Sequence, residues 1–283
     1  MIRIEAPAKI NLLLDIIKRL PNGYHVLFMV MQAVSLYDTI EAEQAESGIT
    51  LTCSEPTLPT DEKNLAYRAA QAFLESTGIK GGCSLAVTKR IPLQAGLAGG
   101  STDAAGVLRA LNLLFDTKLT TEELCRIGVK LGADVPFCLH GGTMLAQDIG
   151  QILSPLPRLK DCCIVLAKPT QGVSTGEAYA AFDECKDVRH PDDWGMLHAL
   201  ATEDFDGVVR RVNNVFEQFI EVPERIAIKT VMRRHGSLCC CMSGSGPTVF
   251  GLFDEEARAA ACVAELKQSF EQVYLTHPVG RFS

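Results

Sequence analysis

The sequence predicts an α+β fold built in two parts. Segments with strand character cluster together, mostly in the first 55 residues, instead of alternating strictly with helical segments. After about residue 155 the pattern changes to a strand, several helical segments and further strands, which is typical of a split βαβ sandwich. A chain of 283 residues is long enough for two modest domains. We therefore expect one domain over residues 1–156 and a second over residues 157–283.

The first domain is expected to combine long strands with amphipathic helices. The first helix has its apolar residues at helical spacing and Gly78 at its end. A later helix begins at a capping box formed by Thr120 and Glu123. In order, we expect strands within Ala6–Ile17 and Val26–Glu43, a helix over Asp61–Ser76, a strand over Cys83–Lys89, a helix over Ser101–Leu114 and a helix from Thr120 that stops at Gly132.

The second domain is expected to begin and end with a strand. The segment between Asp183 and Asp204 shows no pattern to which we assign a function. In order, we expect a strand over Cys162–Ala167, helices near Thr175–Asp183, Glu203–Phe219 and Glu224–His235, strands on either side of Ser243–Pro247, a helix over Glu255–Phe270 and a strand over Val273–His277.

The composition argues against several classes of protein. The net charge is −7 and Lys and Arg form no run, so a broad basic face for nucleic acid is not expected. No apolar stretch reaches the roughly 18–20 residues that span a bilayer, and the amino terminus lacks the pattern of a signal peptide. We therefore expect a cytoplasmic protein that acts on a small molecule, with neither a nucleic acid nor a membrane as its partner.

The 11 cysteines do not form a recognisable metal site. Neighbouring residues of a strand point to opposite faces, so Cys239, Cys240 and Cys241 cannot converge on one metal ion. No CxxC pair occurs in the sequence. We expect buried, reduced thiols, with a zinc site as the alternative.

The most informative segment is the glycine-rich stretch PLQAGLAGGSTDAA, residues 92–105. A predicted strand ends before it, and a helix of small residues begins within it. Glycines let backbone amides approach phosphate oxygens, and the amino terminus of a helix adds free N–H groups and partial positive charge. The spacing G-x-x-G-G, with no Gly-Lys-Ser/Thr, differs from a Walker loop and from the dinucleotide fingerprint. We interpret it as a phosphate-binding loop, with an ordinary glycine-rich turn as the alternative.

Two distant segments hold candidate catalytic residues. Lys9 lies on a predicted strand in APAKINL, with Asn11 on the same face. Asp134 in LGADVPF lies among apolar residues, so it needs a partner such as Lys9 or a shifted pKa. Phosphoryl transfer needs a carboxylate that accepts the hydroxyl proton and a cation near the transferred group. Alternatively, Lys9 extends its amine to solvent and Asp134 is only a turn residue.

A second glycine-rich segment is CMSGSGPTVFGLF, residues 241–253. It is predicted to form a strand, a tight turn and another strand. The backbone amides of Ser243 to Gly246 would then cluster and support the phosphate loop or a substrate. A plain hairpin is the alternative.

In this order and spacing, the four segments resemble the galactokinase–homoserine kinase–mevalonate kinase–phosphomevalonate kinase (GHMP) superfamily. The glycine loop is similar to the central motif of that superfamily, and MSGSGPTVFG to its carboxy-terminal motif. The resemblance covers essentially the whole chain. It implies an amino-terminal domain like domain 2 of ribosomal protein S5 and a ferredoxin-like split βαβ carboxy-terminal domain.

A narrower resemblance, to kinases of cytidine diphosphate-linked methylerythritol, rests on four segments: APAKINLLLDIIKRLPNGYH, QAVSLYDTI, LGADVPF and GVST. It implies transfer of the γ-phosphate of ATP, with Mg²⁺, to the 2-hydroxyl of that substrate in the non-mevalonate route to isopentenyl diphosphate. A homoserine or mevalonate kinase, and a non-catalytic nucleotide-binding protein on the same fold, are the alternatives. The oligomeric state is left open between monomer and homodimer.

The same resemblance implies roles for individual residues. Lys9 and Asp134 match the catalytic pair, and no residue is assigned to a metal. The substrate-binding matches are Tyr24 and His25 for the cytosine, Tyr179 for the other face of that base, and Asn11 and Thr175 for the methylerythritol end. The ATP-binding matches are Asn64 on the adenosine side and, in the phosphate loop, Pro92, Leu93, Gln94, Ala95, Gly96, Leu97, Ala98, Gly99, Gly100, Ser101 and Thr102.

Two positions of the loop depart from the pattern of the family. Ala98 stands where Gly is expected, and Thr102 stands where Ser is common. A methyl group at position 98 restricts φ without abolishing the loop's ability to bind phosphate. The glycine loop therefore keeps its interpretation, with the effect of Ala98 left open.

Overall fold

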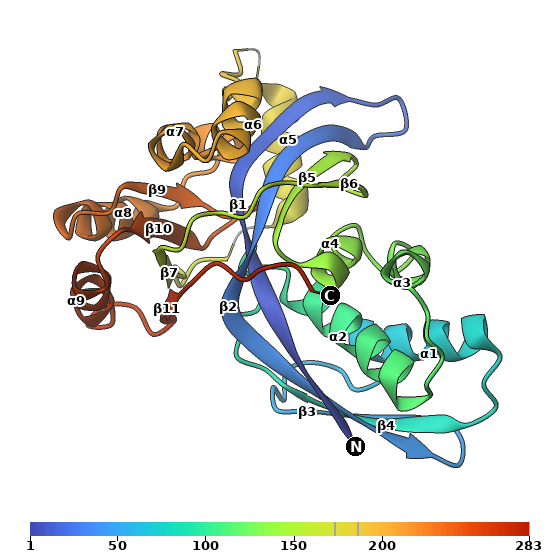
Figure 1. The fold of residues 1–283 in the computed structure, drawn as a ribbon. Coiled ribbons are helices and arrows are strands. Elements are labelled where there is room, and N and C mark those ends of the chain that lie inside the picture. Colours follow the sequence, from blue (N-terminus) through green and yellow to red (C-terminus); the bar gives the residue numbers. More distant parts are fainter. Residues whose placement is uncertain (173, 186, 283) are drawn as a thin grey trace.

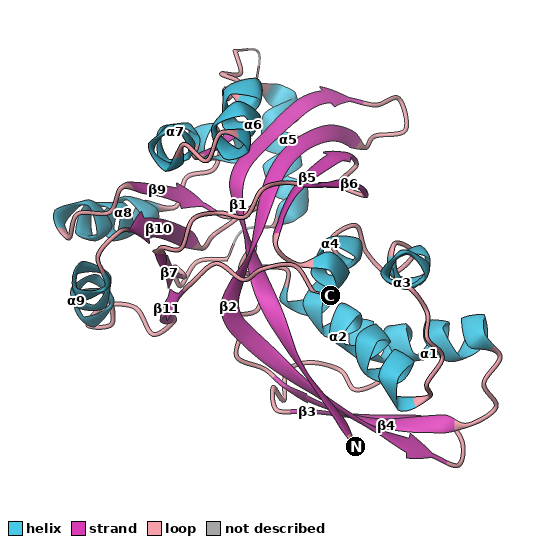
Figure 2. Ribbon diagram, viewed as in Figure 1, coloured by secondary structure: helices cyan, strands magenta, loops and turns pink. Residues whose placement is uncertain are grey.

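The computed structural model describes residues 1–172, 174–185 and 187–282 (Figure 1). These residues form two β-sheets with helices packed against them, which confirms the α+β class (Figure 2). Within the GVST motif, Val173 lies outside the described residues. No helix in the described ranges is long and apolar enough to cross a membrane.

The larger sheet is built around two very long antiparallel strands, β1 and β2. Its order is β3-β4-β2-β1-β8, and β5 pairs with both β2 and β6. The high content of apolar residues in β1 and β2 keeps most of both strands buried. In the described residues its strands are β1 (Ile2–Arg19), β2 (His25–Ala45), β3 (Ile49–Cys53), β4 (Gly82–Thr88), β5 (Thr143–Asp148), β6 (Ile152–Pro155) and β8 (Asn213–Asn214).

Helices cover one face of this sheet (Figure 2). The central one, α2, lies close to the strands because its inner residues are small: a β carbon built on Gly106 would lie 2.7 Å from Ile40 Cγ1. Close packing fixes the amino terminus of α2, and with it the glycine loop, relative to β1. The helices on this face are α1 (Leu65–Thr77), α2 (Gly99–Leu114), α3 (Thr121–Gly128) and α4 (Val135–His140).

The smaller sheet is antiparallel, with the order β11-β7-β10-β9. Helices α8 and α9 bury their apolar residues, including Ile228, Met232 and Cys262, against Val165 and Phe253 of the sheet. The elements are β7 (Cys163–Ala167), α8 (Pro223–Arg234), β9 (Cys239–Met242), β10 (Val249–Phe253), α9 (Glu256–Leu266) and β11 (Val273–Thr276).

Between β7 and α8 the chain passes alongside the far ends of β1 and β2 (Figure 1). The elements there are α5 (Thr175–Glu184), α6 (Asp193–Ala201), α7 (Phe205–Arg211), β8 and the 3₁₀ helix η1 (Val215–Gln218). The last residues also return to the larger sheet, where Val279 N donates to Ala33 O at 2.8 Å. The chain thus crosses between the sheets more than once, and the division at residues 156 and 157 stays a prediction.

The helix predicted over Glu203–Phe219 is wrong in its second half. Helix α7 ends at Arg211, and β8 then pairs in parallel with Leu13 and Leu14 of β1. The buried Asn214 amide donates to Met242 O at 2.8 Å and to Gly244 O at 2.7 Å. These tertiary hydrogen bonds outweigh the local helical pattern, because a buried side-chain amide needs partners.

The helix predicted from Thr120 to Gly132 ends early, although its capping box is present. It stops at Gly128, where a β carbon would lie 2.7 Å from Val135 Cγ1. The chain turns there so that α4 can pack against α3. Helices α4 and α6 and strands β5 and β6 had not been predicted; α6 lies in the segment to which no function was assigned.

Candidate active site

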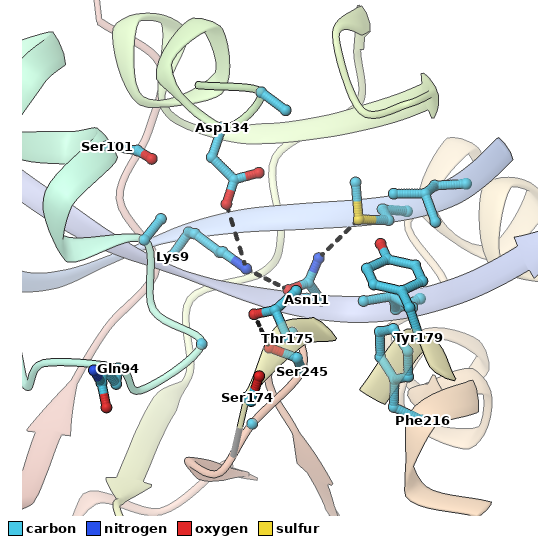
Figure 3. A pocket seen from close by; sticks show the side chains of 18 of the residues that line it. Lys9, Asn11, Gln94, Ser101, Asp134, Ser174, Thr175, Tyr179, Phe216 and Ser245 are labelled. Atoms are coloured by element: carbon cyan, nitrogen blue, oxygen red, sulfur yellow. Dashed lines mark hydrogen bonds and ion pairs between the residues drawn. The ribbon is translucent and has the colours of Figure 1, made fainter. Parts of the chain in front are cut away.

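Lys9 lies in the middle of β1, and its side chain is buried. Its Nζ atom donates to Asn11 Oδ1 at 2.6 Å and lies 4.0 Å from Asp134 Oδ2 (Figure 3). Burial lowers the pKa of Lys9 below its ordinary value, while the negative charge of Asp134 opposes that shift. The structure thus brings together three residues that the sequence had placed in two distant segments.

Asp134 precedes α4 at its N-cap position, but its side chain makes no capping hydrogen bond. The carboxylate turns instead toward Lys9 (Figure 3). About a third of the side chain, 32%, is exposed to the cavity described below. A carboxylate that is held near a cation and is not used by its own helix can accept a proton from a bound hydroxyl.

The glycine loop is held by the second glycine-rich segment. Gly96 has a φ of +72°, and a β carbon there would lie 2.1 Å from Ser243 O, so only glycine fits. Ser243 Oγ donates to Gly96 O at 2.9 Å, and Lys9 N donates to Leu97 O at 3.1 Å. The turn at 243–246 therefore supports the loop, in keeping with one of its two interpretations.

Ala98 occupies a left-handed backbone conformation, with φ of +60° and ψ of +29°, at the N-cap of α2. This conformation favours glycine, which gives a physical reason for the glycine expected there. Leu97 and Thr102 are buried and line neither of the cavities described next. Thr102 Oγ1 donates to Pro7 O at 2.7 Å, so that hydroxyl ties the loop to β1.

Two cavities share the glycine loop as a common wall. One has a volume of about 850 Å³ and contains the side chains of Lys9, Asn11 and Asp134. The other, of about 710 Å³, lies on the side of α1 and includes Asn64. The residues that line both are Gln94, Gly96, Ala98 and Ser101. A group bound to the loop would therefore have access to both cavities, which we call the acceptor cavity (with Lys9) and the donor cavity (with Asn64).

Asn64 caps α1 at the wall of the donor cavity. Its Oδ1 accepts from Ala66 N at 2.9 Å, and its Nδ2 donates to Pro59 O at 2.8 Å. The segments 58–59 and 63–65 therefore have a fixed shape beside the loop residues Pro92 to Ser101. Pro92, Leu93, Ala95, Gly99 and Gly100 line the donor cavity alone.

A buried ion cluster forms part of the wall of the donor cavity, and sequence reasoning missed it. Lys89 Nζ contacts Asp38 Oδ2 and lies 2.5 Å from Asp103 Oδ2. Asp38 Oδ1 also accepts from Ile91 N at 2.8 Å, directly before the loop. Burial raises the pKa of Asp103 to about 8; Lys89 opposes the shift and Asp38 adds to it. The three side chains come from β2, the end of β4 and α2, so no local pattern could reveal them.

The far end of the acceptor cavity is apolar. Figure 3 shows Tyr179 and Phe216 on the opposite side of Lys9 from Ser101 and Gln94. The two aromatic rings meet edge to face, with centroids 5.1 Å apart. Burial raises the pKa of Tyr179 to about 12, and the charge of Asp134 adds to the shift. Thr175 lines the same cavity and shares a hydrogen bond of 2.9 Å with Ser245.

Neither His25 nor Tyr24 lines this cavity. The His25 ring stacks on Tyr179, with centroids 4.6 Å apart, and its Nε2 is 2.8 Å from Asp183 Oδ1. Tyr24 is 60% exposed. The structure therefore joins His25 to the aromatic end of the cavity, and it leaves Tyr24 outside. Sequence reasoning also missed the lining residues Phe216 and Glu177, which belong to no motif, whereas Ser245 lies in the second glycine-rich segment.

The fold and the shared glycine loop are those of a small-molecule kinase. The profile described as "GHMP kinases N terminal domain" matches residues 64–142, and "GHMP kinases C terminal" matches residues 192–272. The two matches together cover more than half of the chain, so the chain belongs to the GHMP kinases.

More specific similarity comes from curated relatives named 4-diphosphocytidyl-2-C-methyl-D-erythritol kinase. The one from Clostridium beijerinckii is 46% identical over 98% of this chain and 100% of its own length. The one from Geobacillus kaustophilus is 43% identical over 98% and 97%. Within the GHMP kinases, the chain belongs to the 4-diphosphocytidyl-2-C-methyl-D-erythritol kinase family.

Solved structures agree with this assignment. A crystal structure of 4-(cytidine 5'-diphospho)-2C-methyl-D-erythritol kinase superimposes with a TM-score of 0.81 and 33% identity, covering 98% of this chain and 99% of that one. A homoserine kinase from Cytophaga hutchinsonii has a TM-score of 0.77 at 22% identity over 99% and 95%. The second likeness concerns the fold alone.

Proposed function

We propose that this protein is an ATP-dependent kinase that phosphorylates the 2-hydroxyl of 4-diphosphocytidyl-2-C-methyl-D-erythritol. This reaction belongs to the methylerythritol phosphate route to isopentenyl diphosphate. The observation that carries the proposal is the shared loop: Gly96 and Ser101 line both the cavity with Asn64 and the cavity with Lys9 and Asp134. ATP bound in the donor cavity would present its γ-phosphate at this wall, and a hydroxyl in the acceptor cavity would meet it there.

Asp134 is the proposed general base. Its carboxylate accepts the proton of the acceptor hydroxyl as that oxygen attacks the γ-phosphate, and ADP leaves. Lys9, whose Nζ lies 4.0 Å from the Asp134 carboxylate, stabilises the charge on the transferred phosphoryl group. The loop amides and the amino terminus of α2 stabilise the same charge from the other side.

The aromatic end of the acceptor cavity fits a nucleobase. Tyr179 offers a ring face, and the neighbouring His25 and Phe216 extend the aromatic surface. Stacking of a base on an aromatic side chain is worth about 1–3 kcal/mol. We therefore assign cytosine to Tyr179 and His25, and methylerythritol to Asn11 and Thr175, between the base and Lys9.

Mg²⁺ is proposed to accompany ATP. Magnesium is usually held by one or two carboxylates together with substrate phosphates. The Ser101 hydroxyl, which lines both cavities, would offer an oxygen ligand beside the phosphates. The described residues hold no group of three or more His, Cys, Asp or Glu side chains that could bind a metal ion unaided. This wall fits an ion that arrives with ATP and neutralises phosphate charge when bound.

An ATP-coupled assay tests the proposal. The purified chain is mixed with Mg-ATP and, separately, with the cytidyl substrate, homoserine or mevalonate, and ADP release is measured. Rapid turnover is expected with the cytidyl substrate alone. Turnover with one of the other acceptors would identify another GHMP kinase, and ATP binding without ADP release would favour a non-catalytic protein.

A further inference from the structure

Lys168 belongs to the second half of the chain, yet it lines the donor cavity. It directly follows β7, and its side chain is half-buried. The same cavity includes the loop residues Pro92 to Gly96 and Ala98 to Ser101. A cation from the second half of the chain therefore lines the same cavity as the glycine loop.

The charges around this cavity are not balanced. Three lysines line it, namely Lys63, Lys89 and Lys168. Lys89 is paired with Asp38 and Asp103 in the buried ion cluster. Within the described ranges, no carboxylate oxygen lies within 4.0 Å of Lys168 Nζ, whose hydrogen bond goes to Pro169 O at 3.4 Å. A positive charge without a counter-ion is thus left at the wall, in a chain whose net charge is −7.

The segment that carries Lys168 is fixed against the loop. Lys168 N donates to Gln272 O at 3.0 Å, and Thr170 N donates to Glu224 Oε2 at 2.7 Å. A β carbon built on Gly172 would lie 3.8 Å from Gln94 Oε1, so the segment reaches the loop itself. Because the backbone is held at both ends, the lysine side chain starts from a defined position beside the loop.

We propose that Lys168 binds the phosphates of ATP together with the glycine loop. The inference rests on the proposed function, since it takes ATP as the occupant of the donor cavity. A lysine ammonium acts as a compact point charge with three donors, which suits a polyphosphate. Lys9 then serves the acceptor side and Lys168 the donor side, so both halves of the chain contribute a cation to the nucleotide.

Binding of ATP, ADP and AMP to Lys168→Gln, measured by calorimetry without acceptor, tests the inference. ATP affinity is expected to fall at least about tenfold, equivalent to about 1.4 kcal/mol, whereas AMP affinity stays within about twofold. Lys168→Arg keeps the charge and should recover most of the ATP affinity. Lys267→Gln removes an exposed lysine that does not line the cavity and is the matched control for loss of charge.

Steady-state kinetics add a second readout. Lys168→Gln should raise the KM for ATP and leave the KM for the cytidyl substrate unchanged. Equal losses of ATP and AMP affinity, or no loss of either, would overturn the inference. If the wild-type chain bound ATP with this dependence on Lys168 but phosphorylated no acceptor, the proposed function would fail while the role of Lys168 would stand.

Discussion

Lys9 Nζ and Asp134 Oδ2 lie 4.0 Å apart, so they attract each other without sharing a hydrogen bond. A charge-assisted N–H···O bond would be about 2.7–2.9 Å long. The short bond of Lys9 goes instead to Asn11 Oδ1, at 2.6 Å. The Asp134 carboxylate thus keeps its lone pairs for an incoming hydroxyl, and Asn11 holds the ammonium group in place.

Asp134→Asn should lower the turnover rate at least about a hundredfold, because an amide cannot accept the hydroxyl proton. ATP affinity should stay close to that of the wild type, since Asp134 lines the acceptor cavity and not the donor cavity. Turnover is measured by ADP release and ATP affinity by calorimetry. A variant with near-wild-type turnover would rule out Asp134 as the base.

Lys9→Ala should also lower turnover by about two powers of ten, because the charge on the transferred phosphoryl group loses a cation. The wild-type rate should fall as the pH rises through the lowered pKa of Lys9, since the lysine acts only when protonated. The alkaline limb of the rate profile is therefore expected below the ordinary value of 10.5. The residual activity of Lys9→Ala should not show this fall in rate at alkaline pH. If the wild type and the variant lost activity over the same alkaline range, Lys9 would not be the titrating group.

Tyr179→Ala should raise the KM for the cytidyl substrate by about ten- to a hundredfold, in line with the loss of about 1–3 kcal/mol of stacking. The KM for ATP should not change, because Tyr179 lies at the far end of the acceptor cavity. Tyr179→Phe keeps the ring and is the matched control. If the alanine and phenylalanine variants bound the substrate equally well, stacking on this ring would not contribute to recognition.

Ala98→Gly should increase the free energy of unfolding by up to about 1 kcal/mol, because it relieves a left-handed backbone conformation. Ala95→Gly is the control within the same loop, since Ala95 is not among the residues with positive φ. That change should lower stability by about 0.5–1 kcal/mol. Urea unfolding measures both variants, and a loss of stability in Ala98→Gly would contradict the strain at this position.

Asp103 should make stability depend on pH. Its pKa in the folded protein is raised to about 8 from an ordinary 3.8, so the folded state keeps a proton that the unfolded state releases. The free energy of unfolding should therefore decrease as the pH rises from about 4 to about 8. Asp103→Asn cannot titrate and should lose this part of the dependence. The unfolding temperatures of the wild type and of Asp103→Asn are measured at pH 5 and pH 8. If both proteins lost the same stability between these pH values, Asp103 would not be the source of the dependence.

The sequence by itself determined the features that are encoded within a short window. The capping box of Thr120 and Glu123, the end of α1 at Gly78 and the start of α2 inside the glycine loop follow from local geometry. The glycine expected at position 98 came from the resemblance to the family, and only the structure showed the left-handed backbone that explains it. The order of the four motifs was enough to indicate the family.

The tertiary structure alone decided which distant residues meet. Lys9 and Asp134 come together because α4 packs against β1, and Lys89 reaches two carboxylates because β2, β4 and α2 converge. It also ended α7 at Arg211, where the strand pairing of β8 and the buried amide of Asn214 outweighed the helical pattern. Such contacts depend on sheet register and on the burial of polar groups, which only the folded chain brings about.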